Sequence, residues 1–205
     1  MASSNNLRLS IVLSTHQTQF EAVAFKSDFE SGIAKIAGWG YDGVELAIRD
    51  PDFVDVSMLE RVISDHGLKV PAIGTGQAWV EERLSFTSPD QEVRRAAIDR
   101  IKSHFPLAKH FDALVIIGLI RGVTPQEQTH TQSMQYLIEC LQECTDAARS
   151  AGVLLALEPL NRYETDLIRT ADEGLDLLDR VKSNNLGLLL DTFHMNIEEA
   201  PRWGD

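Results

Sequence analysis

The stretch VLLALE at 153–158 has a close counterpart in LGLLLD at 186–191. Each is a run of mainly apolar residues at consecutive positions that ends in an acidic residue. Consecutive rather than alternating apolar positions are typical of parallel strands covered on both faces. The two acids are 33 residues apart, about the length of one strand and one helix in a βαβ unit. The pair therefore predicts two neighbouring parallel strands joined by a helix.

Similar apolar runs recur earlier in the chain. Longer segments with helical periodicity separate them, and this alternation indicates an α/β fold with a parallel sheet. The four earlier runs are Leu9–Leu13, Gly43–Leu46, Leu68–Ile73 and Ala113–Ile117. No linker marks a second domain, so we expect one domain over residues 1–205. The predicted fold is a (β/α)₈ TIM barrel with about six β/α units, truncated after the sixth strand, because a closed barrel needs eight units and about 250 residues.

Three segments with capping-box residues predict helix starts: Ser88–Gln91, Thr124–Glu127 and Thr170–Glu173. Pro106 should kink or end the helix that follows Ser88, since proline lacks an N–H donor. Apolar residues at i, i+3 and i+4 spacing predict which sides of two later helices face the sheet. They are Met134, Leu137, Ile138, Leu141 and Cys144 in one helix, and Leu175, Leu178 and Val181 in the next.

Composition limits the class of partner. The chain has 19 Lys and Arg against 31 Asp and Glu, a net charge of −12, which disfavours nucleic acids and anionic membrane surfaces. No apolar run has the length of a signal peptide or a membrane span, so we expect a cytoplasmic protein. The two cysteines, Cys140 and Cys144, share one helix face and are expected to be core thiols.

Two acids are placed where an active site would be. Glu158 and Asp191 each follow the last residue of a predicted strand, and neighbouring strands lie about 4.8 Å apart. Both carboxylates can therefore point into one pocket at the upper rim of the barrel, and together they suit a hard divalent cation. The alternative is that each acid caps a following turn or helix. Spacing alone leaves these two interpretations evenly balanced.

Longer motifs around these acids carry a family resemblance. LEPLNRYE at 157–164 and DTFHMNIEE at 191–199 resemble the ketose 3-epimerases, the tagatose and psicose 3-epimerase group of the xylose isomerase-like barrels. GTGQ at 74–77 and IIGLIRG at 116–122 are similar to members of the wider sugar phosphate isomerase/epimerase superfamily. The resemblance extends from about Leu9 to Glu199.

The resemblance implies a role for four residues. Glu158 would bind the metal and exchange a proton with the substrate carbon, and Asp191 would be a second metal ligand. Glu164 and His194 would hydrogen-bond the sugar. The implied cofactor is a divalent metal, Mn²⁺ first, with Mg²⁺ or Co²⁺ as alternatives, and the implied reaction is proton transfer through an ene-diolate. The family's two other ligands, a histidine on strand seven and a glutamate on strand eight, would lie beyond residue 205.

Three functions follow as alternatives. The leading one is a metal-dependent isomerase or epimerase acting on a ketose or sugar phosphate, impaired because half of the metal site is missing. The second is a non-catalytic barrel remnant or interaction module, in which open sheet edges allow a homo-oligomer. A metal-dependent nuclease is disfavoured by the acidic charge.

Several other residues are weaker candidates. His16 and Glu45 follow the first two strands and are expected either at the same rim or in plain surface positions. Trp79 and Phe86 lie in the loop after the third strand, where packing is favoured over a lid role. Arg121 follows the fourth strand, and a single arginine there is slight evidence for a phosphate site.

Overall fold

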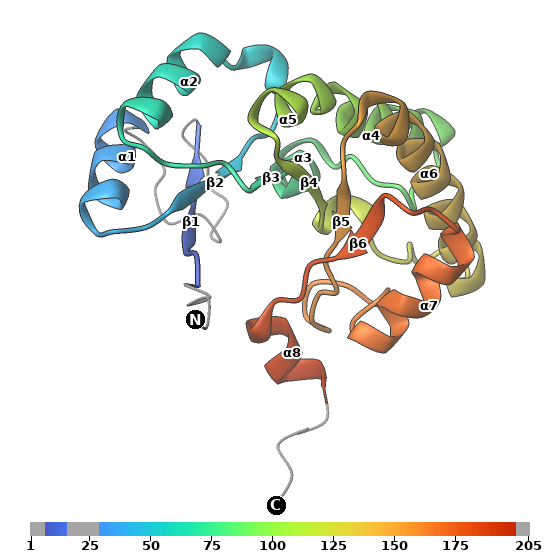
Figure 1. The fold of residues 1–205 in the computed structure, drawn as a ribbon. Helices are drawn as coiled ribbons and strands as arrows, with labels where there is room; N and C mark the ends of the chain where they lie inside the picture. The colour runs from blue at the N-terminus through green and yellow to red at the C-terminus, as the bar shows by residue number, and fades with distance from the viewer. Residues whose placement is uncertain (1–6, 16–28, 200–205) are drawn as a thin grey trace, which may run out of the picture.

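A computed structural model describes residues 7–15 and 29–199 of the chain. Its centre is a six-stranded parallel sheet in which each strand pairs with the next along the sequence (Figure 1). The strands are β1 (Ser10–Ser14), β2 (Gly43–Ala47), β3 (Ala72–Gly74), β4 (Leu114–Ile117), β5 (Leu155–Leu157) and β6 (Leu186–Leu188). This order and direction confirm the predicted barrel type with six β/α units. The sheet is open between β1 and β6.

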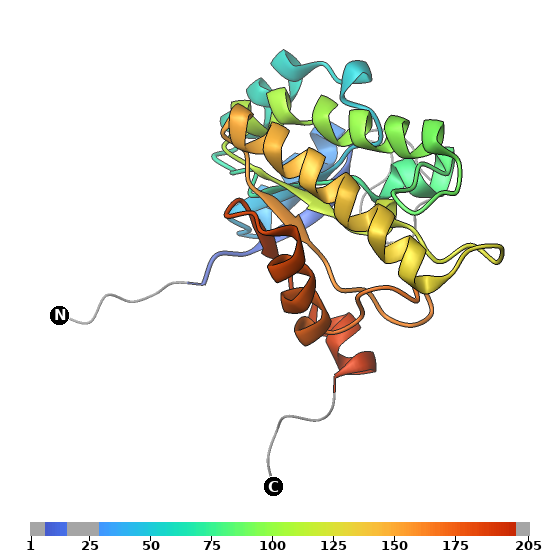
Figure 2. The same ribbon diagram turned by 90° about the vertical axis from the view of Figure 1, so that its right-hand side faces the viewer.

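Helices surround the outer side of this sheet. In Figure 1 they form an arc from α1 and α2 to α6 and α7, and Figure 2 shows α4 and α6 side by side across the strands. The α-helices are α1 (Phe29–Gly38), α2 (Val56–Asp65), α3 (Gly76–Glu82), α4 (Gln91–Ser103), α5 (Phe105–Phe111), α6 (His130–Ala151), α7 (Ala171–Val181) and α8 (Thr192–Glu198). Two 3₁₀ turns, η1 (Pro51–Phe53) and η2 (Leu119–Arg121), follow β2 and β4.

The core lies between the sheet and these helices. All five residues predicted to face the sheet from α6, from Met134 to Cys144, are buried. Cys140 and Cys144 are free thiols in this core, as expected, and burial raises the pKa of Cys140 to about 12. Among the described residues no helix has both the length and the apolar character needed to cross a membrane.

The predicted buried side of α7 was wrong in part. Leu175 is 54% exposed, and the buried residues are Gly174, Leu177 and Val181. The cause is a close approach of α7 to β6: a Cβ on Gly174 would lie 2.9 Å from Cδ2 of Leu188. The glycine lets the helix backbone rest on the strand, and this turns Leu175 outward.

Two predicted helix starts were also wrong. The N-cap of α4 is Asp90, whose carboxylate accepts from the Glu92 N–H at 2.8 Å, and not Ser88. Thr129 rather than Thr124 caps α6, because the segment before it forms a turn in which Gln128 N–H donates to the Pro125 carbonyl. The third start is confirmed: Thr170 caps α7 and accepts from the Glu173 N–H.

The predicted break at Pro106 is confirmed. Helix α4 ends at Ser103 and α5 begins at Phe105, which places the proline in the first turn, where its missing N–H costs nothing.

Candidate active site

The carboxyl ends of the strands border a cleft of about 800 Å³. Four strands, β1 to β4, and the helices α3 and α8 contribute to its wall. The acids Glu158, Asp191, Glu164 and Glu45 all line it, together with His194. The structure thus brings the four site residues expected from the sequence to one place. His16 lies outside the described residues.

Glu158 directly follows β5, and the neighbouring strand makes room for it. Its N–H donates to the Ile117 carbonyl of β4 at 3.1 Å, and its carboxylate lies against Gly118. A Cβ at Gly118 would come within 3.1 Å of Oε2 of Glu158. A larger residue there would press on the acid, so the glycine fixes where the carboxylate can lie.

Asp191 has a structural role in addition to its place in the cleft. Its Oδ1 accepts from the Phe193 N–H at 2.8 Å, which makes it the N-cap of α8. Its Oδ2 lies 3.8 Å from Nε2 of His194. One oxygen therefore caps the start of α8 while the other lies near His194 in the cleft. The two interpretations that the sequence left open are compatible for this residue.

The acids in the cleft repel one another. Burial, then the charges of Asp191 and Glu45, raise the pKa of Glu158 to about 7, and Arg121 partly opposes them. Burial and the charge of Asp191 also raise the pKa of Glu45. Such crowding favours any bound proton or cation, and a carboxyl that titrates near neutral pH is suited to general acid–base chemistry.

His194 has a defined donor direction. The backbone N–H of Asn161 lies 3.3 Å from Nδ1 of His194, and the Asn161 amide nitrogen lies 2.8 Å from it. The amide orientation is fixed because the Tyr163 N–H donates to Asn161 Oδ1 at 2.9 Å. Nδ1 must therefore accept, and the ring proton is on Nε2, which faces Glu158 and Asp191 at 3.8 Å each.

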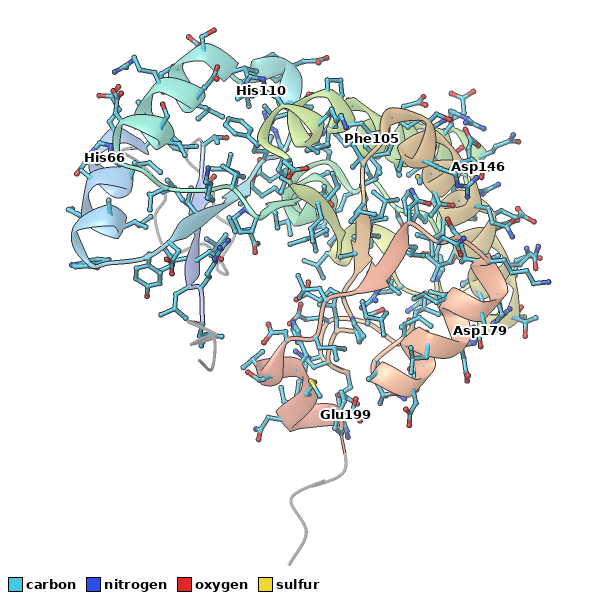
Figure 3. All side chains as sticks on the ribbon, viewed as in Figure 1. His66, Phe105, His110, Asp146, Asp179 and Glu199 are labelled. Atoms are coloured by element: carbon cyan, nitrogen blue, oxygen red, sulfur yellow. The ribbon has the colours of Figure 1, made fainter. Side chains whose placement is uncertain are left out.

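Glu164 completes this side of the cleft. It accepts from the Asn161 amide at 2.9 Å and lies 3.8 Å from the His194 ring. Helix α8, which carries His194, is held by Glu198, which pairs with Arg162 at 2.8 Å, and by Glu199, labelled in Figure 3, which accepts from the Ala171 N–H at 2.8 Å.

Glu158, Asp191 and His194 have ligand atoms within 4.8 Å of one another. Distance alone would allow all three to meet one ion. The assigned tautomer makes Nε2 of His194 a donor, so the two carboxylates are the better ligands. Crowded carboxylate oxygens fit a hard divalent cation.

The sequence as a whole matches a known family. Residues 33–205 match the model described as the xylose isomerase-like TIM barrel. The chain belongs to this family. Among curated members it is 34% identical over 185 residues to the D-psicose 3-epimerase of Ruminiclostridium cellulolyticum, and 31% identical over 188 residues to the L-ribulose 3-epimerase of Mesorhizobium japonicum. These matches cover 85% and 90% of this chain.

A solved family member is similar in structure. The D-psicose 3-epimerase from Clostridium cellulolyticum H10, crystallised with D-tagatose, superposes with a TM-score of 0.75 and 27% identity over 94% of this chain. That match covers 66% of the solved chain. The chain spans 61% and 62% of the length of the two curated epimerases. It is therefore homologous to ketose 3-epimerases over most of its own length and over part of theirs.

Sequence reasoning missed one residue of the site, Asn161. It stands inside the 157–164 motif, so the resemblance could have indicated it. The weaker candidates lie in different environments. Glu45 lines the cleft, Phe86 is fully buried in the core and Trp79 is half-buried. Arg121 is fully buried and its guanidinium has no hydrogen-bond partner in the described structure, which gives no support to an accessible phosphate site.

Proposed function

We propose that this chain carries the Glu158 half of a ketose isomerase or epimerase site, in which a carboxylate exchanges a proton with the carbon next to a sugar carbonyl. One observation carries the proposal. A half-buried carboxyl with a pKa of about 7 lies on the cleft wall beside a second acid, and an Nε2–H donor faces both. A proton acceptor and a hydrogen-bond donor at one place are what carbonyl enolisation needs.

The proposed cofactor is a divalent cation held by Glu158 and Asp191, with Mn²⁺ first and Mg²⁺ or Co²⁺ as alternatives. When bound, such an ion supplies Lewis-acid polarisation of a carbonyl oxygen. The fit rests on two crowded carboxylates, one of which has a pKa raised first by burial and then by its acidic neighbours.

The side chains of the cleft supply proton transfer and hydrogen bonds to the substrate. Glu158 takes the α-proton, which leaves the substrate as an ene-diolate, and returns it to the same face. His194 donates from Nε2 to an oxygen of the sugar, and Glu164 accepts from a hydroxyl. Inversion at the carbon requires a second group that delivers a proton to the other face, and among the described residues we assign no group to this role.

We further propose that residues 1–205 form one domain and that the protein is cytoplasmic. The proposed substrate is a small sugar rather than a nucleic acid, because the net charge of −12 disfavours binding to a phosphate backbone. A non-catalytic interaction module is the second candidate. The observation that favours it is the open sheet, in which β1 and β6 each pair on one side only.

The test separates proton exchange from inversion. The 205-residue chain is incubated with Mn²⁺, D₂O and either D-psicose or D-tagatose, beside the Glu158→Gln variant and a chimera extended after Glu199 with the final strands of the Ruminiclostridium relative. We expect slow deuterium uptake without epimer from the chain, epimer from the chimera, and neither from Glu158→Gln in either background. A folded chimera that neither exchanges nor epimerises any ketose would leave the interaction module as the function.

A further inference from the structure

Gln77 is a buried amide on the wall of the cleft, in the first turn of α3. Its side chain is fully buried and lines the same cleft as Glu158. Its Nε2 donates to Oγ of Ser14 at 3.0 Å, and its Oε1 has no hydrogen-bond partner among the described residues. If the amide were turned over, Nε2 would be the unpaired atom instead.

An unpaired buried amide atom is costly to a protein. Leaving such a group unsatisfied destabilises the folded protein, and buried polar atoms nearly always have partners. A buried amide that lacks one hydrogen-bond partner among the described residues and lies on the wall of a cleft is suited to a ligand that supplies the missing hydrogen bond.

Ion pairs at the C-terminal end of α3 hold the helix that carries Gln77 in place. Glu81 pairs with Arg49 at 2.9 Å, and Glu82 pairs with Arg100 at 2.8 Å. Arg100 also donates to the Arg49 carbonyl at 2.8 Å, which ties α4 to the loop after β2. These contacts anchor the helix that carries Gln77, and the bond to Ser14 is the side-chain contact that orients its amide.

The position of Gln77 indicates which part of a sugar it would meet. It follows β3, two strands from Glu158 after β5, which corresponds to about 10 Å across the sheet. That is the scale of a six-carbon chain and exceeds a three-carbon one. Glu45 lies on the same side, with Oε1 close to Gly74 of β3, and makes no hydrogen bond within the described residues.

The geometry points to Gln77 as the residue that binds a hydroxyl at the far end of the substrate chain and so selects for ketoses longer than three carbons. This inference rests on the proposed function, which places the carbonyl end beside Glu158. Gln77 is a specificity residue and not a catalytic one, because it lies away from the reacting carbon. The ligand it recognises is a polyhydroxy chain that offers an O–H donor to Oε1.

The test compares a long and a short ketose on one protein. Calorimetry with Mn²⁺ measures binding of D-psicose and of dihydroxyacetone, which has no distal hydroxyls, to the 205-residue chain and to Gln77→Met. The variant keeps the size of the side chain and removes the amide. We expect about 3- to 10-fold weaker binding of D-psicose, the worth of one hydrogen bond, and unchanged binding of dihydroxyacetone. The matched control is Gln135→Met, on the exposed side of α6.

Each other result overturns the inference. Equal loss for both ketoses would mean that Gln77 only supports the fold, and no loss for either would mean that its amide meets no hydroxyl. If Gln77→Met does not fold, the shorter amide of Gln77→Asn replaces it with the same expected ratio. Absence of binding of either ketose to the unaltered chain would refute the proposed function and this inference together, whereas binding that ignores Gln77 would refute the inference alone.

Discussion

The backbone N–H and the side-chain amide of Asn161 both point at Nδ1 of His194, at 3.3 and 2.8 Å. Two donors at one ring nitrogen place the imidazole proton on Nε2, toward the carboxylates. We predict that long-range ¹H–¹⁵N NMR spectra show the Nε2–H tautomer for His194 in the metal-free chain. In Asn161→Asp an acceptor replaces the amide donor while the backbone N–H remains, so the share of the Nε2–H tautomer should fall.

The same substitution should destabilise the fold. An aspartate at 161 would face the carboxylate of Glu164, from which the amide nitrogen is 2.9 Å away, and we expect a loss of about 1–3 kcal/mol in urea unfolding. An Nδ1–H signal from His194 in the unaltered chain would contradict the assignment and return Nε2 to the set of metal ligands.

Glu158 should make the metal-free protein less stable at high pH. Its carboxyl has an ordinary pKa of 4.5 and a pKa of about 7 when folded, so the folded state holds the proton more tightly, and stability falls as pH rises from 4.5 to 7. At about 1.4 kcal/mol per tenfold change in the proton equilibrium, this amounts to about 3 kcal/mol above pH 7. Glu158→Gln should recover much of it at pH 8 and little at pH 5, as measured by urea unfolding with a chelator.

Glu143 provides a control of opposite sign. Hydrogen bonds from Arg95 and Lys102 lower its pKa, so its contribution is present above the ordinary pKa and is lost as pH falls. Glu143→Gln should therefore slightly destabilise the protein at pH 8. If Glu158→Gln were destabilising at pH 8 as well, burial and the neighbouring acids would not be raising the pKa of Glu158.

The sequence predicted the strand order and the barrel type because six separated apolar runs allow few parallel arrangements. It was less accurate about where elements begin. The run Leu68–Ile73 yields a strand only from Ala72, since Pro71 has no N–H for the ladder and Lys69 forms an isolated bridge to Gly43. Asp90 replaces Ser88 as a cap because both are good cap residues and the packing of α4 selects between them.

Some residues of the candidate site could likewise be predicted from the sequence and others could not. Glu158 and Asp191 could be placed from the sequence because strand ends meet at one edge of a parallel sheet. The motif at 157–164 could have indicated Asn161, but its contact with His194, 33 residues further along the chain, could not be predicted from the sequence. Gln77 could not either, because an unpaired amide atom is a property of the packed structure and no sequence pattern encodes it.

Metal binding by this chain should be weak and should depend on Asp191. Two carboxylates fill less than half of an octahedral shell, so calorimetry should give an Mn²⁺ affinity weaker than micromolar. Glu158→Gln and Asp191→Asn should weaken it further. Asp90→Asn is a matched control, because Asp90 caps α4 through a 2.8 Å bond to the Glu92 N–H as Asp191 caps α8. Sub-micromolar binding, or equal effects of the two Asp→Asn changes, would argue against the site.

The two open edges of the sheet should cause self-association. Within residues 7–15 and 29–199, strands β1 and β6 each pair with one neighbouring strand, and the free edge of such a strand offers backbone N–H and C=O groups to another chain. Near the β6 edge, Leu190 is 49% exposed and Phe193 is 62% exposed. We predict that light scattering shows a mass that rises with concentration above that of the 22.8 kDa monomer.

A lysine on the β6 edge should reduce this association. Gly187 lies in β6 and is exposed, and a Cβ there would meet nothing within 4 Å, so Gly187→Lys should fold normally. Charge on an edge strand disfavours pairing with a second strand, and the mass should fall toward that of the monomer at equal concentration. Gly38→Lys adds the same charge at the end of α1, where a Cβ also has open space, and should leave the association unchanged. A concentration-independent monomer with cooperative, high-temperature unfolding in the unaltered chain would show that the edges do not recruit a partner.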